Sequence, residues 1–294
     1  MVGLDFTQQY ILKLGIIFLG IRLSFEELIK FGSIAIPLIV ICIVGVLILV
    51  KLLIKKVPIS SKMSYLIAIG TSVCGATAIV ATAPVINAKK SEVAYAIANI
   101  TLFGVIAMIV YPYFAEWYFD NDSLKIGLFL GTSIHETSQV AAAGLIYDQQ
   151  FNSPETLNVA TVTKLIRNTF LVILIPLFAF LYNRGELKGQ NYSILSIFPY
   201  FVIGFIGMII VRNIGDQFFT PNNNSYDLWI NLIGYLKTLA TVFLTMAMAA
   251  VGISINLSEL KSMGYKPFVV GLIAAITVGL ISLIYIETLI KFIY

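Results

Sequence analysis

Long apolar runs separated by short polar linkers dominate the pattern of residues along the chain. Most runs approach the length of about 20 residues that a helix needs to cross the hydrocarbon of a bilayer. They do not alternate between polar and apolar positions, as the strands of a membrane β-barrel would. The pattern therefore predicts nine helical membrane segments, at residues 10–23, 34–54, 63–88, 93–114, 126–146, 157–182, 194–211, 228–253 and 267–290.

Charged residues at the segment ends indicate an orientation. Basic residues lie at one set of junctions: Lys51, Lys55, Lys56, Lys62, Lys89, Lys90, Arg184 and Lys188. Acidic residues flank the segment 126–146: Glu116, Asp120, Asp122, Asp148 and Glu155. Because basic loops stay in the cytoplasm, both ends of 63–88 are expected inside and both ends of 126–146 outside. Each of these two segments is therefore predicted to form a re-entrant hairpin.

The same two segments share an internal repeat. Residues 70–81 (GTSVCGATAIVA) line up with residues 131–142 (GTSIHETSQVAA), and Pro112 of the next segment lines up with Pro176. In the orientation given by the charges, the repeats have opposite directions. Inverted repeats with glycine-interrupted segments are typical of secondary transporters, which bind substrate at the repeat interface near the membrane midplane. The alternative is that the small residues only allow close helix packing.

A second pair of similar stretches, 20–28 and 252–260, is also inverted in this orientation. The segment 194–211 has no such partner, so the repeat predicts one or two further helices ahead of residue 1. The chain is interpreted as one membrane domain. Scaffold helices are expected at 1–58 and 189–294, with a transport core at 59–188 between them.

The composition excludes most soluble classes of protein. Hydrophobic residues make up 59% of the 294 positions and charged residues 12%, with a mean hydropathy of +0.94. Ordinary soluble domains carry about 45–50% apolar and about 25% charged residues. The net charge of +4 is too small to indicate nucleic-acid binding, and Cys42 and Cys74 lie in apolar runs that do not suggest a disulfide framework. No cleavable signal peptide is evident, and the fold class expected is an all-α polytopic membrane protein.

The two glycine-containing breaks are the expected substrate site. Glycine lets the backbone leave the helix, and a half-helix that begins there directs free N–H groups at an anion. Carbonyls at the end of the preceding half-helix would instead suit Na⁺. The candidates for substrate contact in the two breaks are Thr71, Ser72, Gly75, Thr77, Thr132, Ser133, His135 and Gln139.

His135 and Glu136 are the titratable pair within these breaks. A zinc site is not expected, because the second histidine of a zinc-binding helix is replaced by Gln139 and the chain has no other histidine. A carboxylate inside an apolar segment is costly, so Glu136 is the candidate for coupling to H⁺ or Na⁺, with a structural ion pair as the alternative. His135 is either hydrogen-bonded within the hairpin or takes part in proton or substrate binding.

Lys164 and Arg167 are three residues apart and share one face of the predicted helix 157–182. Two cations beside one carboxylate favour an anionic substrate, and the guanidinium suits oxyanions. The alternative for Lys164 is that it extends toward the membrane surface. Asn99 is a further candidate ligand or a residue that joins helices, and Lys237 is left out of the site.

These motifs resemble a known family. Residues 70–86 (GTSVCGATAIVATAPVI), 92–112 (EVAYAIANITLFGVIAMIVYP), 133–144 (SIHETSQVAAAG) and 247–253 (AMAAVGI) are similar to the YeiH family of bacterial inner-membrane proteins, labelled as sulfate exporters. The resemblance covers nearly the whole chain. It implies an inner-membrane protein of the cation–proton antiporter and anion transporter superfamily, with inverted repeats, discontinuous helices and extra N-terminal helices.

The expected function is secondary active transport of a small anion, such as sulfate, a sulfonate or another oxyanion, coupled to H⁺ or Na⁺. An anion channel built from the same residues is the alternative. A membrane enzyme that uses His135 and Glu136 as an acid–base pair is a further alternative, although the chain is not expected to be an enzyme. No cofactor or nucleic-acid partner is expected; the expected partners are the anion and membrane lipid, with a homodimer left open.

Overall fold

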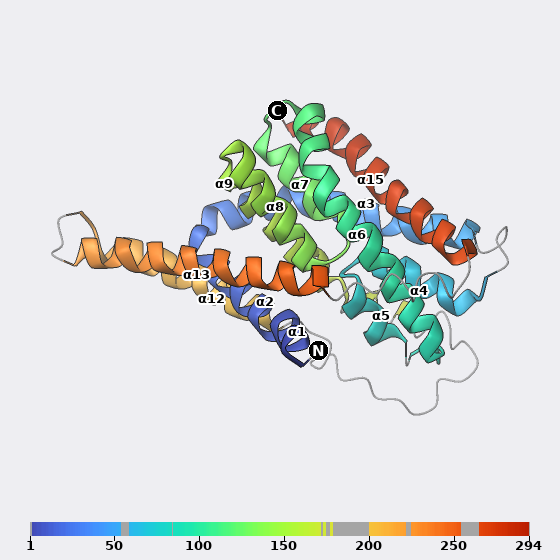
Figure 1. Cartoon of the computed structure of the whole chain (residues 1–294). Coiled ribbons are helices and arrows are strands. Elements are labelled where there is room, and N and C mark those ends of the chain that lie inside the picture. Colours follow the sequence, from blue (N-terminus) through green and yellow to red (C-terminus); the bar gives the residue numbers. More distant parts are fainter. Residues whose placement is uncertain are drawn as a thin grey trace.

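The computed structural model describes residues 2–53, 59–83, 85–171, 173–174, 177–178, 200–221, 225–253 and 265–293. All regular secondary structure in these residues is helical (Figure 1). In the first half the helices are α1 (Val2–Phe6), the π-helix η1 (Thr7–Ile11), α2 (Leu12–Leu19), the 3-10 helix η2 (Gly20–Arg22), α3 (Phe25–Leu53), α4 (Ser61–Ser72), α5 (Ala76–Thr82) and α6 (Lys90–Phe119). They are followed by α7 (Ser123–Ser133), α8 (Thr137–Phe151), α9 (Pro154–Thr169), α12 (Phe201–Phe218), α13 (Tyr226–Ile253) and α15 (Tyr265–Ile293).

Four of these helices are long and apolar enough to cross a membrane. They are α3, α6, α13 as far as Ala247, and α15 as far as Thr288. They correspond to the predicted segments 34–54, 93–114, 228–253 and 267–290, although α3 begins earlier than predicted, at Phe25. The expectation of an α-helical membrane protein is therefore confirmed at this level.

The other predicted segments are shorter helices or fall partly outside the described residues. Segment 10–23 becomes α2 and η2, preceded by a π-helical turn that the apolar pattern did not predict. The described parts of segments 157–182 and 194–211 contain α9, with 16 residues, and α12, with 18. Several residues that entered the charge and repeat arguments lie outside the described residues: Lys55, Lys56, Pro176, Arg184, Lys188 and most of the stretch 252–260.

Both segments with a Gly-Thr-Ser sequence are interrupted helices. Segment 63–88 consists of α4 and α5, separated by residues 73–75, and segment 126–146 consists of α7 and α8, separated by residues 134–136. Gly75 has a φ of +67°, a conformation that side chains with a Cβ rarely adopt. The second break uses extended backbone at Ile134 and Glu136 instead, so it needs no glycine.

In each interrupted helix, the two outer ends lie close together. Lys62 Nζ, at the start of α4, donates to Asn87 O after the end of α5 at 2.7 Å. Ser123 Oγ, at the start of α7, lies 2.8 Å from Ser153 Oγ, just after α8. The second half of each pair therefore returns toward the side on which the first half began.

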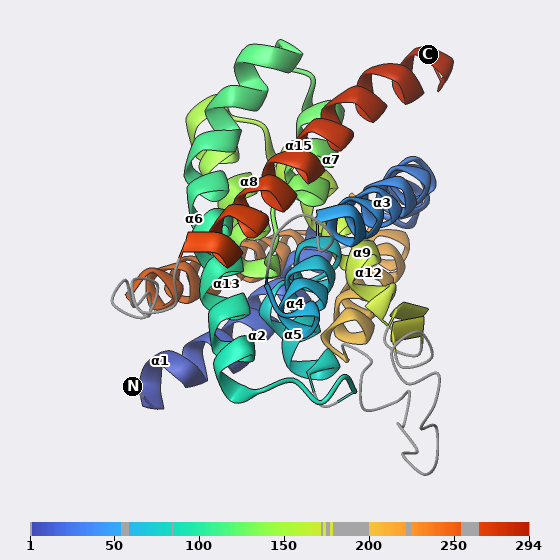
Figure 2. The same ribbon diagram turned by 90° about the vertical axis from the view of Figure 1, so that its right-hand side faces the viewer.

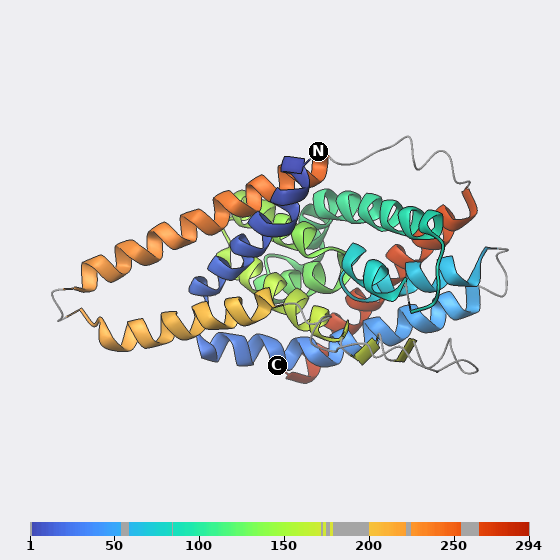
Figure 3. The same ribbon diagram turned by 90° about the horizontal axis from the view of Figure 1, so that it is seen from below.

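The interrupted helices pack in the middle of the molecule. Figure 2 shows α15 crossing in front of α7, with α6 on one side, α3 on the other and α4 below, and α15 contacts all four. Seen from below, α2, α12 and α13 form a separate group, and the far ends of α12 and α13 extend beyond the other helices (Figure 3). The second group contacts the first through α8 and α3.

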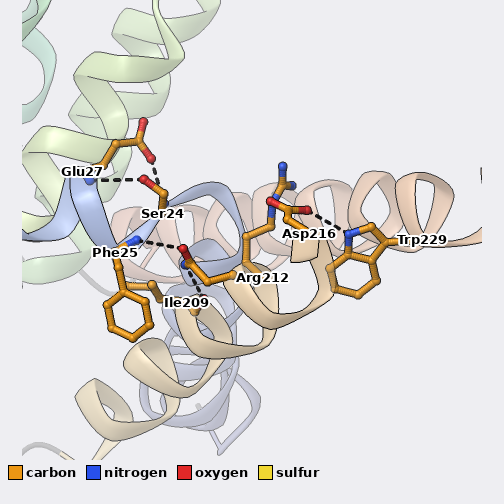
Figure 4. A network of polar contacts seen from close by, with 8 residues as sticks. Ser24, Phe25, Glu27, Ile209, Arg212, Asp216 and Trp229 are labelled. Atoms are coloured by element: carbon orange, nitrogen blue, oxygen red, sulfur yellow. Dashed lines mark hydrogen bonds and ion pairs between the residues drawn. The ribbon is translucent and has the colours of Figure 1, made fainter. Parts of the chain in front are cut away.

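A polar network fastens the start of α3 to α12 (Figure 4). Ser24 and Glu27 form a reciprocal cap, in which Ser24 N donates to Glu27 Oε2 at 2.7 Å and Glu27 N donates to Ser24 Oγ at 3.2 Å. The next backbone N–H donates to Asn213 Oδ1 of α12 at 3.3 Å. Further along α12, Asp216 accepts a 2.9 Å hydrogen bond from the indole of Trp229 in α13. These bonds set the depth of α12 relative to α3 and α13.

Two glycines one turn apart allow α7 to lie against α9. A Cβ at Gly127 would be 2.5 Å from Val159 Cβ, and one at Gly131 would be 2.8 Å from Ala160 O. Small residues four positions apart are a common means of bringing membrane helices into close contact. This contact positions α9, which carries Lys164 and Arg167, against the second break.

We expect Gly127→Leu to separate α7 from α9 and lower the melting temperature of the protein in detergent. Overpacking of a close contact costs about 1–3 kcal/mol or more. Gly234→Leu is the matched control, because a Cβ at Gly234 in α13 would meet no atom within 4 Å. A melting temperature for Gly127→Leu equal to that of the control would contradict this packing.

Candidate functional site

Lys164 joins the two helix breaks. Its ammonium donates to Val73 O at 2.7 Å in the first break, and to Ile134 O at 3.0 Å and His135 O in the second. The side chain is fully buried. An ammonium has three N–H donors, so all of the hydrogen-bonding capacity of Lys164 is used by backbone carbonyls.

Arg167, one turn further along α9, makes the same kind of connection. Its Nε donates to Ser72 O at 2.8 Å, and one terminal nitrogen donates to Thr132 O at 2.5 Å and Ile134 O at 3.3 Å. The other terminal nitrogen donates to Thr71 O. A helix end leaves carbonyls without intrahelical partners, so Arg167 and Lys164 cap the C-terminal ends of α4 and α7 together.

Glu136 occupies the opposite side of the breaks. It is the N-cap of α8, where the backbone N–H of Glu136 donates to Gln139 Oε1 at 3.3 Å. Thr101 Oγ1 of α6 donates to Glu136 Oε1 at 3.0 Å. The backbone N–H of Ala76, at the start of α5, also donates to the carboxylate.

Two glycines make room for this arrangement. A Cβ at Gly75 would lie 2.4 Å from Glu136 Cγ, so the first break fits against the Glu136 side chain only without one. A Cβ on Gly104 of α6 would lie within 2 Å of Gln139 Oε1. Gln139 Nε2 donates to Thr101 O at 3.1 Å in the same turn of α6. The N-terminal end of α8 is therefore held against the middle of a helix long enough to span the membrane.

The two sides of the breaks differ in accessibility. Lys164, Arg167 and the carbonyl-bearing residues at the ends of α4 and α7 are buried. In contrast, Thr77 is exposed, and Ala76, Thr101, Glu136 and Thr137 are half-buried. The N-terminal ends of α5 and α8 thus face accessible space, whereas the C-terminal ends of α4 and α7 do not.

The hydroxyls predicted to bind substrate fall into two groups. Thr132 Oγ1 lies 2.6 Å from Leu128 O and 2.6 Å from Ser282 Oγ of α15, and Ser133 Oγ donates to Phe129 O at 2.5 Å, so these two are used within the protein. Thr71 Oγ1 and Ser72 Oγ are buried and have no hydrogen-bond partner among the described residues. Of the predicted threonines and serines, Thr77 is the one on the accessible side.

Asn99 and His135 lie away from that accessible side. Asn99 Nδ2 donates to Pro267 O at the start of α15 at 2.9 Å, and its Oδ1 lies over Gly271, so it joins α6 to α15. His135 is buried, and its Nδ1 has no hydrogen-bond partner in the described part of the chain. Its backbone carbonyl, rather than its ring, contacts Lys164.

Three residues near the breaks were not singled out from the sequence. Thr101 and Ser282 are isolated hydroxyl residues in long apolar helices, a signal too common to distinguish them. Asn168, next to Arg167, donates from Nδ2 to Thr137 Oγ1 at 2.9 Å, and its buried Oδ1 has no partner within the described ranges. The sequence signal that could have identified Asn168 is its place as a polar residue directly after Arg167.

The charges around the breaks do not cancel. When all three side chains are ionised, Lys164 and Arg167 contribute two positive charges and Glu136 one negative charge. Helix ends carry about half a charge each, negative at the C-terminal ends of α4 and α7 and positive at the N-terminal ends of α5 and α8. These four end charges cancel, so the site retains about one positive charge. In the described residues, no group of three His, Cys, Asp or Glu side chains could hold a metal ion.

We expect Arg167→Met to destabilise the protein strongly. Each buried carbonyl that loses its partner costs about 1–3 kcal/mol, and Arg167 is the side-chain partner of three, those of Thr71, Ser72 and Thr132, whereas Ile134 O keeps Lys164. Arg212→Met is the control, because Arg212 forms an exposed ion pair with Asp216 within α12. Melting temperatures in detergent distinguish the variants, and equal values would contradict the capping role of Arg167.

Comparisons with known proteins agree with this architecture. Residues 1–271 match the family described as Conserved hypothetical protein 698. A UPF0324 membrane protein of Fusobacterium nucleatum is 35% identical over 286 residues, which cover 96% of this chain and 82% of the relative. The UPF0324 inner membrane protein YeiH of Escherichia coli K12 is 33% identical over 279 residues, which cover 92% of this chain and 74% of the relative.

A UPF0324 membrane protein of Streptococcus agalactiae is 34% identical over 279 residues, covering 95% of this chain and 80% of the relative. No solved structure matches the chain. The relatives are named as membrane or inner membrane proteins, in agreement with the four apolar helices of suitable length. The chain therefore belongs to the UPF0324 family, which includes YeiH, and is a multi-pass protein of the inner membrane.

Proposed function

We propose that the protein is a secondary transporter that carries a small anion, such as sulfate, a sulfonate or another oxyanion, across the inner membrane. The observation that carries this proposal is the polarity of the two breaks. Their accessible side has the N-terminal ends of α5 and α8, with hydroxyl groups at Thr77, Thr101 and Thr137. Backbone N–H groups and hydroxyls at a helix N-terminus are the usual ligands of oxyanions in proteins.

The charge of the site supports an anion over a cation. The carbonyls at the ends of α4 and α7 would be the natural ligands of Na⁺, but Lys164 and Arg167 already bind them. The remaining charge of about one positive unit, estimated from the helix ends and side chains, attracts an anion. Among the expected coupling ions, H⁺ at Glu136 therefore fits better than Na⁺.

The position of the site supports transport through the membrane. Thr101 lies near the middle of α6, about 17 Å from its start at 1.5 Å per residue. Half-buried polar groups at this depth are stable where they face water or other protein rather than lipid. The paired ends of α4–α5 and α7–α8 support two re-entrant hairpins that meet there, as in transporters with inverted repeats.

A contact between α8 and the group of α2, η2 and α13 supports alternating access. One terminal nitrogen of Arg22 lies 3.6 Å from Asp148 Oδ2, near the C-terminal end of α8. The other terminal nitrogen donates to Thr241 Oγ1 of α13 at 3.1 Å. If the hairpins move against the other helices, this contact must break. A channel would need no such motion, and an enzyme would need a nucleophile or metal beside His135 and Glu136.

We expect Thr77→Val to weaken anion uptake in proteoliposomes. A hydrogen bond from a neutral donor to a charged group contributes about 1.5–3 kcal/mol, so the half-saturating concentration should rise roughly tenfold or more. Thr245→Val is the matched control, since this exposed hydroxyl bonds only Thr241 O on its own helix. Saturable counterflow of labelled sulfate or another oxyanion tests the carrier, whereas conductance without counterflow would identify a channel.

We expect Arg22→Gln to increase the population of conformations in which the site is accessible from outside the cell. Cys74 lies beside Gly75 in the first break and is buried, and a Cys42→Ala background leaves it as the single thiol. A membrane-impermeant maleimide added to intact spheroplasts should then label Cys74 several times faster in Arg22→Gln. Arg212→Gln, which breaks a pair within one helix, is the control; equal rates in both would argue against movement at this contact.

A further inference from the structure

The carboxylate of Glu136 already binds the donors that the accessible side of the breaks presents. It accepts from the hydroxyl of Thr101 in α6 and from the N–H of Ala76 at the start of α5. The two donors belong to two different helices, and the carboxylate itself belongs to the N-cap of a third, α8. A carboxylate and a small oxyanion use the same kind of donor, so the Glu136 carboxylate and a transported anion compete for them.

One buried polar atom near the start of α8 has no hydrogen-bond partner among the described residues. Asn168 binds Thr137 in the first turn of α8 through Nδ2, and its Oδ1, in a side chain that is only 3% exposed, has no partner among the described residues. Glu136 and Thr137 keep part of their surface accessible. The first turn of α8 is therefore accessible in part, while the unpaired oxygen of Asn168 is an acceptor and is not itself a ligand for an anion.

We infer that Glu136 is a tethered occupant of the anion site, and that the transported anion takes its donors only when Glu136 is protonated and has turned away. This inference rests on the function proposed above. On protonation, the carboxylate gains one proton at an oxygen and loses its charge, so it becomes a much weaker acceptor. When the anion leaves, the proton leaves as well and the carboxylate returns to its donors on α5 and α6.

This exchange determines the relative direction in which the anion and the proton move. The site holds one negative charge when Glu136 is bound and one negative charge when a monovalent anion is bound beside protonated Glu136. Each anion therefore travels with one proton in the same direction, and transport of a monovalent anion moves no net charge. A divalent anion such as sulfate would carry one net negative charge across with the proton.

Three other titratable groups lie near Glu136. Lys164 of α9 is the charged side chain that acts on it, and its three donors are already bound to carbonyls. Cys74, in the α4–α5 break, and His135, its neighbour in the chain, are the other titratable groups nearby. Thr101 of α6 does not titrate.

Anion binding to purified protein in detergent tests this exchange without knowledge of the natural substrate. Thermal shifts are measured with chloride, nitrate, sulfate and methanesulfonate between pH 5 and pH 8. Above the pH at which free Glu136 titrates, the wild-type affinity should fall by about tenfold per pH unit, because binding requires a proton. Glu136→Gln should bind the same anions with no such dependence.

Glu116→Gln is the matched control, because Glu116 lies on α6 and bonds Tyr147 of α8 outside the site. It should keep the wild-type pH dependence. Proton uptake by the wild-type protein gives a second measurement that needs no variant. Addition of a binding anion to a weakly buffered sample should take up about one proton per bound anion where the affinity is falling with pH.

The outcomes separate this inference from the proposed function. Anion binding by the wild type without pH dependence or proton uptake would overturn the tethered role of Glu136 and leave anion transport in place. Loss of binding in a folded Glu136→Gln protein would overturn it too, because the anion would then need the carboxylate. If none of the four anions stabilises the wild type at any pH, the proposed anion site itself is wrong.

Discussion

The capping of two interrupted helices by Lys164 and Arg167 is the interaction on which the remaining structure depends. Two helices that stop within an apolar region expose carbonyls that neither water nor lipid can satisfy, and each unpaired group would cost about 1–3 kcal/mol. Two side chains of one helix supply these partners to both breaks at once. The position of α9 therefore determines where the breaks meet, and the close contact of α7 with α9 follows from it.

The sequence predicted the interrupted helices and their place in the chain because both signals were local. Glycine, threonine and serine within an apolar run mark a break, and charge at the segment ends marks the membrane faces. Lys164 and Arg167 could be assigned to one helix face from their spacing alone. Their partners could not, because a donor that binds backbone carbonyls leaves no trace in the sequence of the acceptor.

The same limit explains the residues that were missed. Thr101 binds Glu136 across 35 positions, and Ser282 meets Thr132 across 150, so neither contact has a local signature. The sequence left two roles open for Asn99, a ligand or a residue that joins helices. Its hydrogen bond to Pro267 O supports the second role. The sequence of a membrane helix also does not indicate which face packs against the rest of the protein, since lipid-facing and buried positions are equally apolar.

The saturation of Lys164 has a consequence for selectivity. Because its three hydrogens are bound within the protein, it acts on a ligand only through its field, which does not depend on the shape of the ligand. Recognition of size and geometry is left to neutral hydroxyls and amides on the other side of the breaks. In the anion transporter proposed above, exchange of small uncharged side chains would therefore change the identity of the anion without changing the sign of its charge.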